Sequence, residues 1–250
     1  MTISWCVTVC NELKEITNLV NFLQLYINPN DEIVVQYDEG GVTDAVLSYL
    51  KIADKMEARM KVVGFPLNND FATFKNNLTV HCTKDYIAQI DADEIPHQNL
   101  VERLGQVLET NTVDLVFLPR INTVNGITEK HVNKWGWNIS KLETQIGEKE
   151  MDTGSEEYKY LKKLDFIINE PYDGQIEYYK PIINAWDYQT RVYRRTDDIV
   201  WVGKVHERIT GYNNFSNFPA KEEWSLFHHK DIDRQTRQNE KYSKMIENKL

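Results

Sequence analysis

The sequence lacks a hydrophobic run long enough to cross a membrane, which takes roughly 20 apolar residues. Its longest apolar stretches are short, such as Ile33 to Val35 and Leu115 to Leu118. The N-terminus has no basic residue before Lys14 and no long apolar stretch, so it does not resemble a secretory signal. We therefore expect no transmembrane segment and a cytoplasmic location.

Cysteine is also scarce, and its number is odd: Cys6, Cys10 and Cys82 are the three residues of this type. On a strand, Cys6 and Cys10 lie about 13 Å apart, which is too far for a disulfide. An odd number outside a secreted framework is typical of reduced thiols. We expect the three cysteines to be reduced core residues.

Basic residues are fewer than acidic ones: the chain has 29 Lys and Arg and 38 Asp and Glu, which gives a net charge of −9. Nothing in this balance attracts the protein to a phosphate backbone or an anionic membrane, so we do not expect a nucleic-acid partner. Hydrophobic residues make up 41% and charged residues 27% of the 250 positions, as in ordinary globular proteins. Since internal repeats, low-complexity tracts and clear linkers are absent, we expect one domain over residues 1–250.

Strand and helix patterns alternate over the first half of the chain. The predicted strands are Ile3 to Val9, Glu32 to Tyr37, Met60 to Phe65, Tyr86 to Ile90 and Asp114 to Leu118. The predicted helices are Leu13 to Tyr26, Thr43 to Lys55, Phe71 to Cys82 and His97 to Glu109. Such alternation is typical of an α/β fold with a mostly parallel central sheet that helices cover on both faces.

Beyond Arg120 the alternation stops. Residues 121 to 190 are rich in Asn, Gly, Trp, Tyr and charge, with one predicted helix over Glu156 to Lys163, and we expect this region to face a ligand. Strand patterns return at Thr190 to Tyr193 and Ile199 to Val205, and a polar helix is predicted over Asp231 to Lys249.

Three carboxylates directly follow the fourth predicted strand, as Asp91, Asp93 and Glu94. Open α/β sheets bind their ligands at the carboxyl ends of the strands. In an extended chain Asp91 and Asp93 point to the same side, so their oxygens can converge on one divalent cation, Mn²⁺ or Mg²⁺. A diphosphate group suits the remaining positions around such a cation. The alternative is that Asp93 and Pro96 merely begin the next helix.

Asp38 ends the second predicted strand and precedes Gly40 and Gly41. A carboxylate there can meet a ribose or a base while the glycines let the backbone approach the ligand. A plain Asp-Gly turn is the alternative interpretation. Because the second and fourth strands of a parallel sheet open at the same edge, the agreement between Asp38 and the Asp91 to Asp93 pair favours a ligand site.

These segments resemble the metal-dependent glycosyltransferases of the GT-A fold, and specifically family 2-like enzymes. The resemblance is carried by Thr8 to Glu12, Val34 to Asp38, Asp70 with Phe71 and Asn76, Tyr86 to Glu94, Arg191 to Tyr193 and Val205 to Glu207. It implies a GT-A (Rossmann-like) fold with an elaborated acceptor-side region. It also implies a nucleotide-sugar-binding half over residues 1–120, an acceptor-binding half over 121–230 and a C-terminal helix over 231–250.

The resemblance implies roles for particular residues. The second aspartate of the D-x-D motif, Asp93, would coordinate the metal on the diphosphate of a UDP- or GDP-sugar. The residues expected to bind the nucleotide-sugar are Thr8, Asn11, Glu12, Asp38, Asn76, Asp91, Ala92 and Arg191. Lys230 is an alternative to Arg191 for offsetting charge on the departing diphosphate.

The second half of the chain holds the residues expected to act on the acceptor. An inverting transfer needs a base for the acceptor hydroxyl, and Glu207 resembles the base of lipopolysaccharide-type family 2 members. A surface ion pair with Arg208 or Lys204 is the alternative role for Glu207. A C-terminal histidine completes the metal site in some GT-A enzymes, so His228 and His229 are candidate ligands.

The sequence thus predicts a hexosyl- or pentosyltransferase that moves a sugar to a hydroxyl of a glycan, a lipid-linked glycan or another acceptor. A nucleotidyltransferase also needs clustered carboxylates and a metal, but it usually has a basic, glycine-rich loop after the first strand, and Val9 to Leu13 is not one. A catalytically inactive module that binds sugar-nucleotides or glycans is the other alternative.

Overall fold

The computed structural model describes residues 1–170, 174–237 and 239. The chain divides into two compact units: the first holds Met1–Pro119 and Tyr188–Leu226, and the second holds Arg120–Asp187 and Phe227–Leu250. Residues 188–226, which include Arg191 and Glu207, therefore belong with the N-terminal strands and helices. The expectation of one domain over the whole chain stays a prediction.

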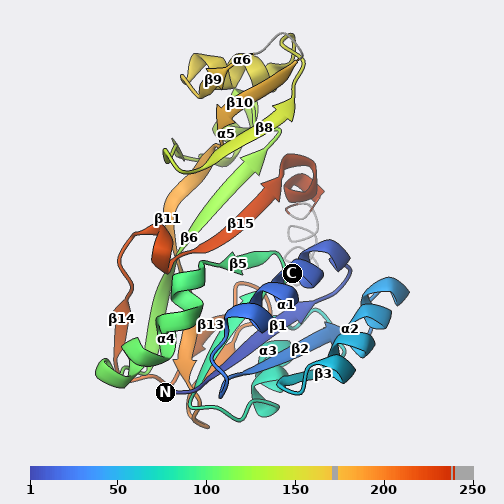
Figure 1. The fold of residues 1–250 in the computed structure, drawn as a ribbon, viewed down its shortest axis with the longest axis vertical. Helices are drawn as coiled ribbons and strands as arrows, with labels where there is room; N and C mark the ends of the chain where they lie inside the picture. Colours follow the sequence, from blue (N-terminus) through green and yellow to red (C-terminus); the bar gives the residue numbers. More distant parts are fainter. Residues whose placement is uncertain (171–173, 238, 240–250) are drawn as a thin grey trace, which may run out of the picture. The chain divides into compact units, whose positions relative to one another are not determined.

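The first unit is built on a mostly parallel sheet with helices on both faces, as expected (Figure 1). Along the chain its elements are β1 (Ile3–Val9), α1 (Leu13–Tyr26), β2 (Glu32–Asp38), α2 (Asp44–Met56), β3 (Met60–Phe65), α3 (Phe71–Val80), β4 (Tyr86–Asp91), β5 (Glu94–Pro96) and α4 (Gln98–Thr110). The strands β6 (Leu115–Asn125) and β11 (Ile182–Arg194) begin or end in this unit, and β12 (Val200–Val202), β13 (Arg208–Thr210), β14 (Phe215–Asn217) and a 3-10 turn (Glu222–Trp224) complete it.

The sheet has the strand order β3-β2-β1-β4-β11-β6. Strand β1 is central, because it pairs in parallel with β2 on one side and with β4 on the other. Strand β11 joins β4 in the antiparallel direction. The carboxyl ends of β1, β2, β3 and β4 consequently open at one edge of the sheet, which is where ligands bind in open α/β sheets.

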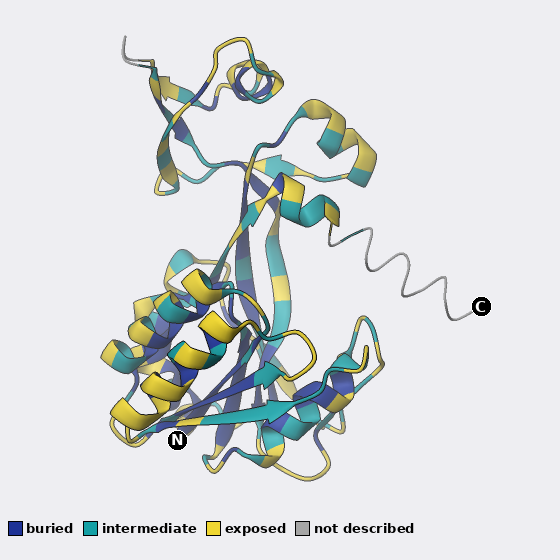
Figure 2. Ribbon diagram, turned by 90° about the vertical axis from the view of Figure 1, so that its right-hand side faces the viewer, coloured by how far each residue is buried: buried dark blue, intermediate teal, exposed yellow. Residues whose placement is uncertain are grey.

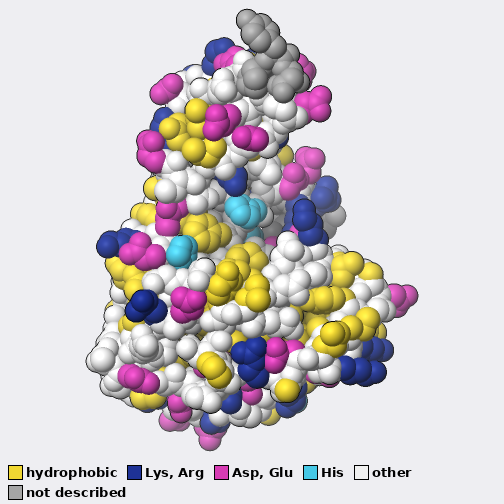
Figure 3. Space-filling model, viewed as in Figure 1, with side chains coloured by type: hydrophobic (Ala, Val, Ile, Leu, Met, Phe, Trp, Pro, Cys, Tyr) yellow, Lys and Arg dark blue, Asp and Glu magenta, His cyan; other side chains and the backbone are white. Residues whose placement is uncertain are grey.

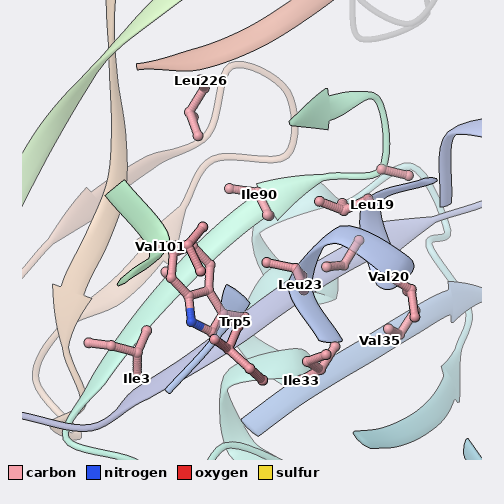
Figure 4. Close-up of a cluster of buried hydrophobic side chains, with 14 of the residues drawn as sticks. Ile3, Trp5, Leu19, Val20, Leu23, Ile33, Val35, Ile90, Val101 and Leu226 are labelled. Atoms are coloured by element: carbon pink, nitrogen blue, oxygen red, sulfur yellow. The ribbon is translucent and has the colours of Figure 1, made fainter. Parts of the chain in front are cut away.

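Alternate side chains of the strands enter two different hydrophobic clusters, because successive residues of a strand point to opposite faces. Trp5 and Val7 of β1 pack on one face, with residues of α1, α2 and α4 (Figure 4). Cys6, between them, packs on the other face with Leu78 of α3. The helices are exposed on their outer sides and buried where they face the sheet (Figure 2).

The second unit has its own core. Its elements are α5 (Glu129–Trp135), β7 (Ile139–Ser140), β8 (Ile146–Glu150), α6 (Glu156–Lys163), β9 (Ile167–Asn169) and β10 (Gln175–Tyr179), together with parts of β6, β11 and β15 (Leu226–Asp231). Strands β8, β10 and β9 form a small antiparallel sheet. Ile127, Leu161 and Ile183 are among the buried residues that hold this unit together.

Several boundaries predicted from the sequence are wrong. The strand predicted to end at Leu118 continues to Asn125, and the one predicted over Thr190 to Tyr193 begins at Ile182. The strand predicted over Ile199 to Val205 ends at Val202, because Gly203 adopts a left-handed backbone with φ of 96°.

The last predicted helix also begins later than expected. Asp231 ends strand β15, and the helix begins at residue 232. The remainder of that predicted helix, at residue 238 and residues 240–250, lies outside the described residues. In the described part of the chain, no helix combines the length and apolar character needed to cross a membrane.

Candidate active site

Several of the predicted nucleotide-binding residues lie at the carboxyl ends of β1, β2 and β4. The parallel register sets Thr8 of β1 beside Asp91 of β4 on one side and beside Gln36 of β2 on the other. The Thr8 hydroxyl donates a hydrogen bond of 3.1 Å to Oδ1 of Asp91, and the backbone N–H of Ala92 donates to the Thr8 carbonyl. Three of the predicted residues thus contact one another directly.

Asp91 is held by a buried arginine. Arg191 lies on β11, is 4% exposed, and its Nη2 lies 2.7 Å from Oδ2 of Asp91 and 2.6 Å from Oε1 of Glu94. Burial lowers the pKa of Arg191, but the two carboxylates outweigh it and the net shift is upward, so the guanidinium stays charged. Arg191 therefore holds the D-x-D segment in place through its ion pairs with Asp91 and Glu94.

Glu94 belongs to this support. Its side chain is fully buried, and besides contacting Arg191 it accepts the backbone N–H of Asp91 at 3.2 Å. The carboxylate of Glu94 therefore binds the guanidinium of Arg191 and the backbone of Asp91 within the protein. Asp91 and Glu94 thus share the guanidinium of Arg191.

Asp93 occupies the turn between β4 and β5 and is half-buried. The alternative that it caps the following helix is wrong, because the residue at the N-cap of α4 is His97, whose Nδ1 accepts the backbone N–H of Asn99. The turn places the carboxylate of Asp93 two residues after Asp91.

Asp38 ends β2 and fixes the loop that follows β3. Its Oδ1 accepts the backbone N–H of Gly40 at 3.1 Å and that of Leu67 at 2.9 Å. A Cβ atom at Gly41 would lie 2.6 Å from Sγ of Cys10 and 2.9 Å from Oδ2 of Asp38, so a larger residue at this position would displace these side chains. The carboxylate thus makes an Asp-Gly turn and also stands at the edge where the strands open.

The loop after β1 is ordered by its own glutamate. Oε2 of Glu12 accepts the backbone N–H groups of Cys10 and Asn11, both at 2.9 Å. Asn11 is exposed beside it. The two residues therefore shape the loop that closes the β1 side of the site.

Asn76 and Glu207 lie on a different part of the first unit, where each has its own partner. Asn76 of α3 clamps the backbone of Trp201, donating to its carbonyl and accepting its N–H, both at 2.8 Å. Glu207 pairs with Nζ of Lys75 at 2.7 Å, and not with Arg208 or Lys204. The amide of Asn76 is thus committed to holding β12.

A chain of backbone contacts links this region to the carboxyl edge of the sheet. Leu67, which donates to Asp38, accepts the backbone N–H of Asp70, and Asp70 caps α3 by accepting the N–H of Thr73. The next N–H, of Phe71, donates to the carbonyl of Lys204 in the loop that carries Glu207. The Glu207 loop therefore abuts the start of α3.

His228 and His229 lie on β15 in the second unit. Nδ1 of His228 is 3.0 Å from Oδ1 of Asn122, whose amide nitrogen donates to Asp187. Nδ1 of His229 bonds the hydroxyl of Thr123. Burial lowers the pKa of His229, and nearby Lys180 and His228 lower it further, which favours the neutral ring that binds metals. Their role as ligands stays a prediction.

The donor set at the D-x-D segment suits a hard divalent cation. Among the described residues, no group of three or more His, Cys, Asp or Glu side chains is arranged to hold a metal. Mg²⁺ and similar ions are commonly bound by one or two carboxylates together with substrate phosphates. Asp93 and Asp91 are residues of the type that this pattern requires.

The roles of two residues in this region were not predicted from the sequence. Glu94 was named only as one of three carboxylates, because its ion pair with Arg191 joins residues that are distant in the sequence. Lys75 carried a detectable signal, because it shares the inward stripe of α3 with Phe71, Phe74 and Leu78 at helical spacing.

Known proteins share this architecture. The crystal structure of S. aureus TarS 1-349 in complex with UDP-GlcNAc has a TM-score of 0.57 and 15% identity, over 92% of this chain and 58% of its own. A second crystal structure of the same TarS fragment has a TM-score of 0.56 and 14% identity, over 92% of this chain. This chain spans about 60% of that fragment's length. No curated protein sequence matches.

The similarity to TarS shows a shared GT-A fold, which confirms the expected fold class. The sequence itself matches the model of the family described as "Glycosyl transferase family 2" over residues 4–168, well over half of the chain. That stretch contains β1 to β4, Asp38 and the D-x-D segment. The chain belongs to glycosyl transferase family 2.

Proposed function

We propose that this protein transfers a sugar from a nucleotide-sugar donor to a hydroxyl group of an acceptor, with inversion at the anomeric carbon. The observation that carries the proposal is the meeting of Thr8, Asp91 and Arg191 at the edge of the sheet where Asp38 also ends its strand. Membership of family 2 supports the reaction class.

The donor is proposed to lie over the carboxyl ends of β1, β2 and β4. Asp38 and the loop from Thr8 to Glu12 hold the nucleoside, and the absence of side chains at Gly40 and Gly41 lets the backbone approach it. TarS was crystallised with UDP-GlcNAc, so a UDP-sugar is the first donor to test, and a GDP-sugar is the second.

Asp93 is proposed to hold Mn²⁺ or Mg²⁺, with Asp91 beside it. When bound, the cation offsets the negative charge that develops on the diphosphate leaving group. The contribution of the chain itself is to keep Asp91 in place: Thr8 and Arg191 hold both of its oxygens, and Glu94 holds its backbone.

Glu207 is proposed as the base. In an inverting transfer the acceptor oxygen attacks the anomeric carbon on the face opposite the diphosphate, and its proton passes to a carboxylate. Glu207 is 17% exposed, so its carboxylate is sheltered from water and still reachable from outside.

The test is a thermal-shift screen of UDP- and GDP-sugars with and without Mn²⁺, followed by a nucleotide-release assay with each donor that binds. We expect a rise in the unfolding temperature that requires both donor and cation, because a ligand that binds only the folded state stabilises it. We also expect metal-dependent release of UDP or GDP.

The other outcomes separate the alternatives. Donor binding that needs no metal and gives no turnover indicates a binding module. Release of pyrophosphate from a nucleoside triphosphate indicates a nucleotidyltransferase. The absence of both binding and release across the panel contradicts the proposed function.

A further inference from the structure

Lys75 is a buried cation that none of the proposed roles uses. It lies on α3 and is 5% exposed, whereas lysines are almost never fully buried unless they are paired. Its Nζ lies 2.7 Å from Oε1 of Glu207. A lysine at this depth is costly to desolvate, so its two neighbours must compensate for the lost water.

The second neighbour is the ring of Trp201. Nζ of Lys75 lies 4.4 Å from the centroid of that ring, within the range of a cation–π interaction. The ring itself is fixed, because its Nε1 donates to the hydroxyl of Tyr193 at 3.2 Å while Asn76 holds the Trp201 backbone from both sides. The ammonium group therefore rests on a rigid support.

The Tyr193 hydroxyl extends this support into the sheet. It bonds the Thr79 hydroxyl at 2.9 Å and donates to Oε1 of Gln89 at 3.2 Å. Residues from α3, β4, β11 and β12 thus converge on the position of one lysine. Side chains held by such a network lose little further freedom when they act on a substrate.

The loop that presents Glu207 has an uncommon backbone. His206, the preceding residue, has φ of 56°, in the left-handed region that residues other than glycine rarely adopt. Gly203, at the start of the loop, has φ of 96°. Residues held in such conformations cluster at functional sites, because the surrounding structure must compensate for the strain.

Stability alone does not account for this ion pair. A buried Lys–Glu pair is often no more stabilising than two apolar residues of similar volume, because desolvation offsets the attraction between the charges. The Lys75–Glu207 pair joins the rigid Trp201 support to the loop that contains His206. We explain it by its effect on the orientation of the Glu207 carboxylate.

We propose that Lys75 is the positioning residue for Glu207, binding Oε1 so that Oε2 faces the acceptor hydroxyl; this rests on the proposed function of Glu207 as the base. In the reaction the O–H bond of the acceptor breaks and its proton moves to Oε2. The acceptor oxygen bonds to the anomeric carbon, and the bond from that carbon to the diphosphate breaks, with the electron pair leaving on the diphosphate. Lys75 keeps its charge over Trp201 throughout.

The test compares Lys75→Met, Lys75→Arg, Glu207→Gln and the double variant Lys75→Met/Glu207→Gln. Donor affinity is measured by calorimetry with Mn²⁺, and kcat by nucleotide release in the presence of an acceptor. The matched control is Lys51→Met on the exposed face of α2, which we expect to behave like the wild type.

We expect Lys75→Met to lower kcat by about 10- to 100-fold, as the loss of an oriented base does. The Kd of the donor should change by less than about twofold, because the step lost follows binding. Lys75→Arg should keep the charge and recover kcat to within about tenfold of the wild type. In the Glu207→Gln background, Lys75→Met should have little further effect, because the two residues act as one unit.

Three results overturn the inference. A weaker donor Kd with unchanged kcat means that Lys75 binds the donor, and additive effects of the two substitutions mean that the residues act separately. A kcat equal to that of the wild type in Lys75→Met, or in the equally neutral Lys75→Gln should Lys75→Met fail to fold, refutes positioning by Lys75. A wild type that neither binds nor turns over any donor instead refutes the proposed function itself.

Discussion

Asp91 and Asp93 share a motif but have different surroundings. Both carboxylate oxygens of Asp91 have partners within the protein, in Thr8 and Arg191. Asp93 lies in a half-buried turn next to that cluster. We therefore assign the two aspartates different roles. Asp91 is held in place by Thr8 and Arg191, and Asp93 is proposed to contact the cation.

This division predicts the effect of Asp93→Asn. The substitution removes the charge and one strong oxygen ligand while keeping the shape, so we expect nucleotide release to fall by about 100-fold or more. The fold should stay intact, because the buried Arg191 cluster is untouched. Initial rates with Mn²⁺, together with circular dichroism, measure both effects.

The control is Asp44→Asn, an exposed residue in the first turn of α2. It changes the net charge equally and lies on a helix remote in sequence from the D-x-D segment, so it should leave the rate unchanged. Turnover by Asp93→Asn at the rate of the wild type would refute a metal role for that carboxylate.

At the residue scale, sequence reasoning predicted contacts between neighbouring strands better than contacts with later parts of the chain. The strand pattern and the D-x-D spacing led to Asp38 and Asp91 at one edge. The pairing of Glu207 with Lys75 was missed, and ion pairs with Arg208 and Lys204 were weighed in its place. No local pattern brings α3 and the Glu207 loop together, because their contact depends on the packing of β12 against α3.

At the scale of elements, β4 and β11 carry the support of the site. The two strands pair in the antiparallel direction, with Val192 opposite Ala88, so Arg191 reaches Asp91 and Glu94 from the neighbouring strand. The antiparallel strand thus provides a cation that holds the end of β4 in place.

We therefore expect Arg191→Met to lower the free energy of unfolding of the first unit. Removing one partner of a buried ion pair leaves uncompensated charge, which costs about 3–5 kcal/mol. Hydrogen exchange of the β1 and β4 amides measures the loss in this unit specifically.

Two further variants make this prediction specific. Arg195→Met removes a more exposed arginine and should cost less than about 1 kcal/mol, as surface substitutions do. Arg191→Met/Glu94→Gln removes one buried charge of each sign and should recover part of the stability. Equal exchange rates in Arg191→Met and the wild type would contradict a supporting role.

The elements of the first unit were predictable because short apolar runs of strand length alternate there with helical apolar stripes. Strand β1 is buried along almost its whole length, and α1, which follows it, buries one stripe of apolar residues. In the second unit β8 reads IGEKE and none of its residues is buried, so no apolar alternation marks it as a strand. Its strands are fixed by pairing with β10, which a single sequence does not reveal.

At the scale of the whole molecule, acidic residues outnumber basic ones. On the face drawn in Figure 3, basic side chains lie scattered among acidic ones. The net charge of −9 makes the binding of an anionic donor dependent on local compensation. That requirement is consistent with the proposed cation at Asp93.

The pH dependence of stability tests the role of Glu32, which links the central strands of the first unit. Glu32 of β2 accepts hydrogen bonds from Ser4 of β1 and from the hydroxyl and backbone N–H of Thr83 in the loop before β4. Burial alone raises the pKa of Glu32, but these hydrogen bonds, with the charge of Lys84, outweigh it and lower the pKa. The ionised carboxylate is therefore the form that ties the three central strands together.

The sign of the effect follows from this shift. Because the pKa of Glu32 is lower in the folded than in the unfolded protein, its contribution is complete above the ordinary pKa of a glutamate, about 4.3. The contribution is lost as the pH falls through the lower folded value. We expect Glu32→Gln to cost about 1–3 kcal/mol at pH 6, as the loss of hydrogen bonds to a charged group does.

The difference in unfolding free energy between the wild type and Glu32→Gln should shrink as the pH is lowered from 6 to 3, because the wild-type carboxylate is then protonated. Hydrogen exchange of the β1 and β2 amides is the measurement, since it reports on the first unit. Glu102→Gln, on the exposed side of α4, is the control and should match the wild type across the range. A difference that stays constant with pH would mean that Glu32 stabilises the strands through its shape and not through its charge.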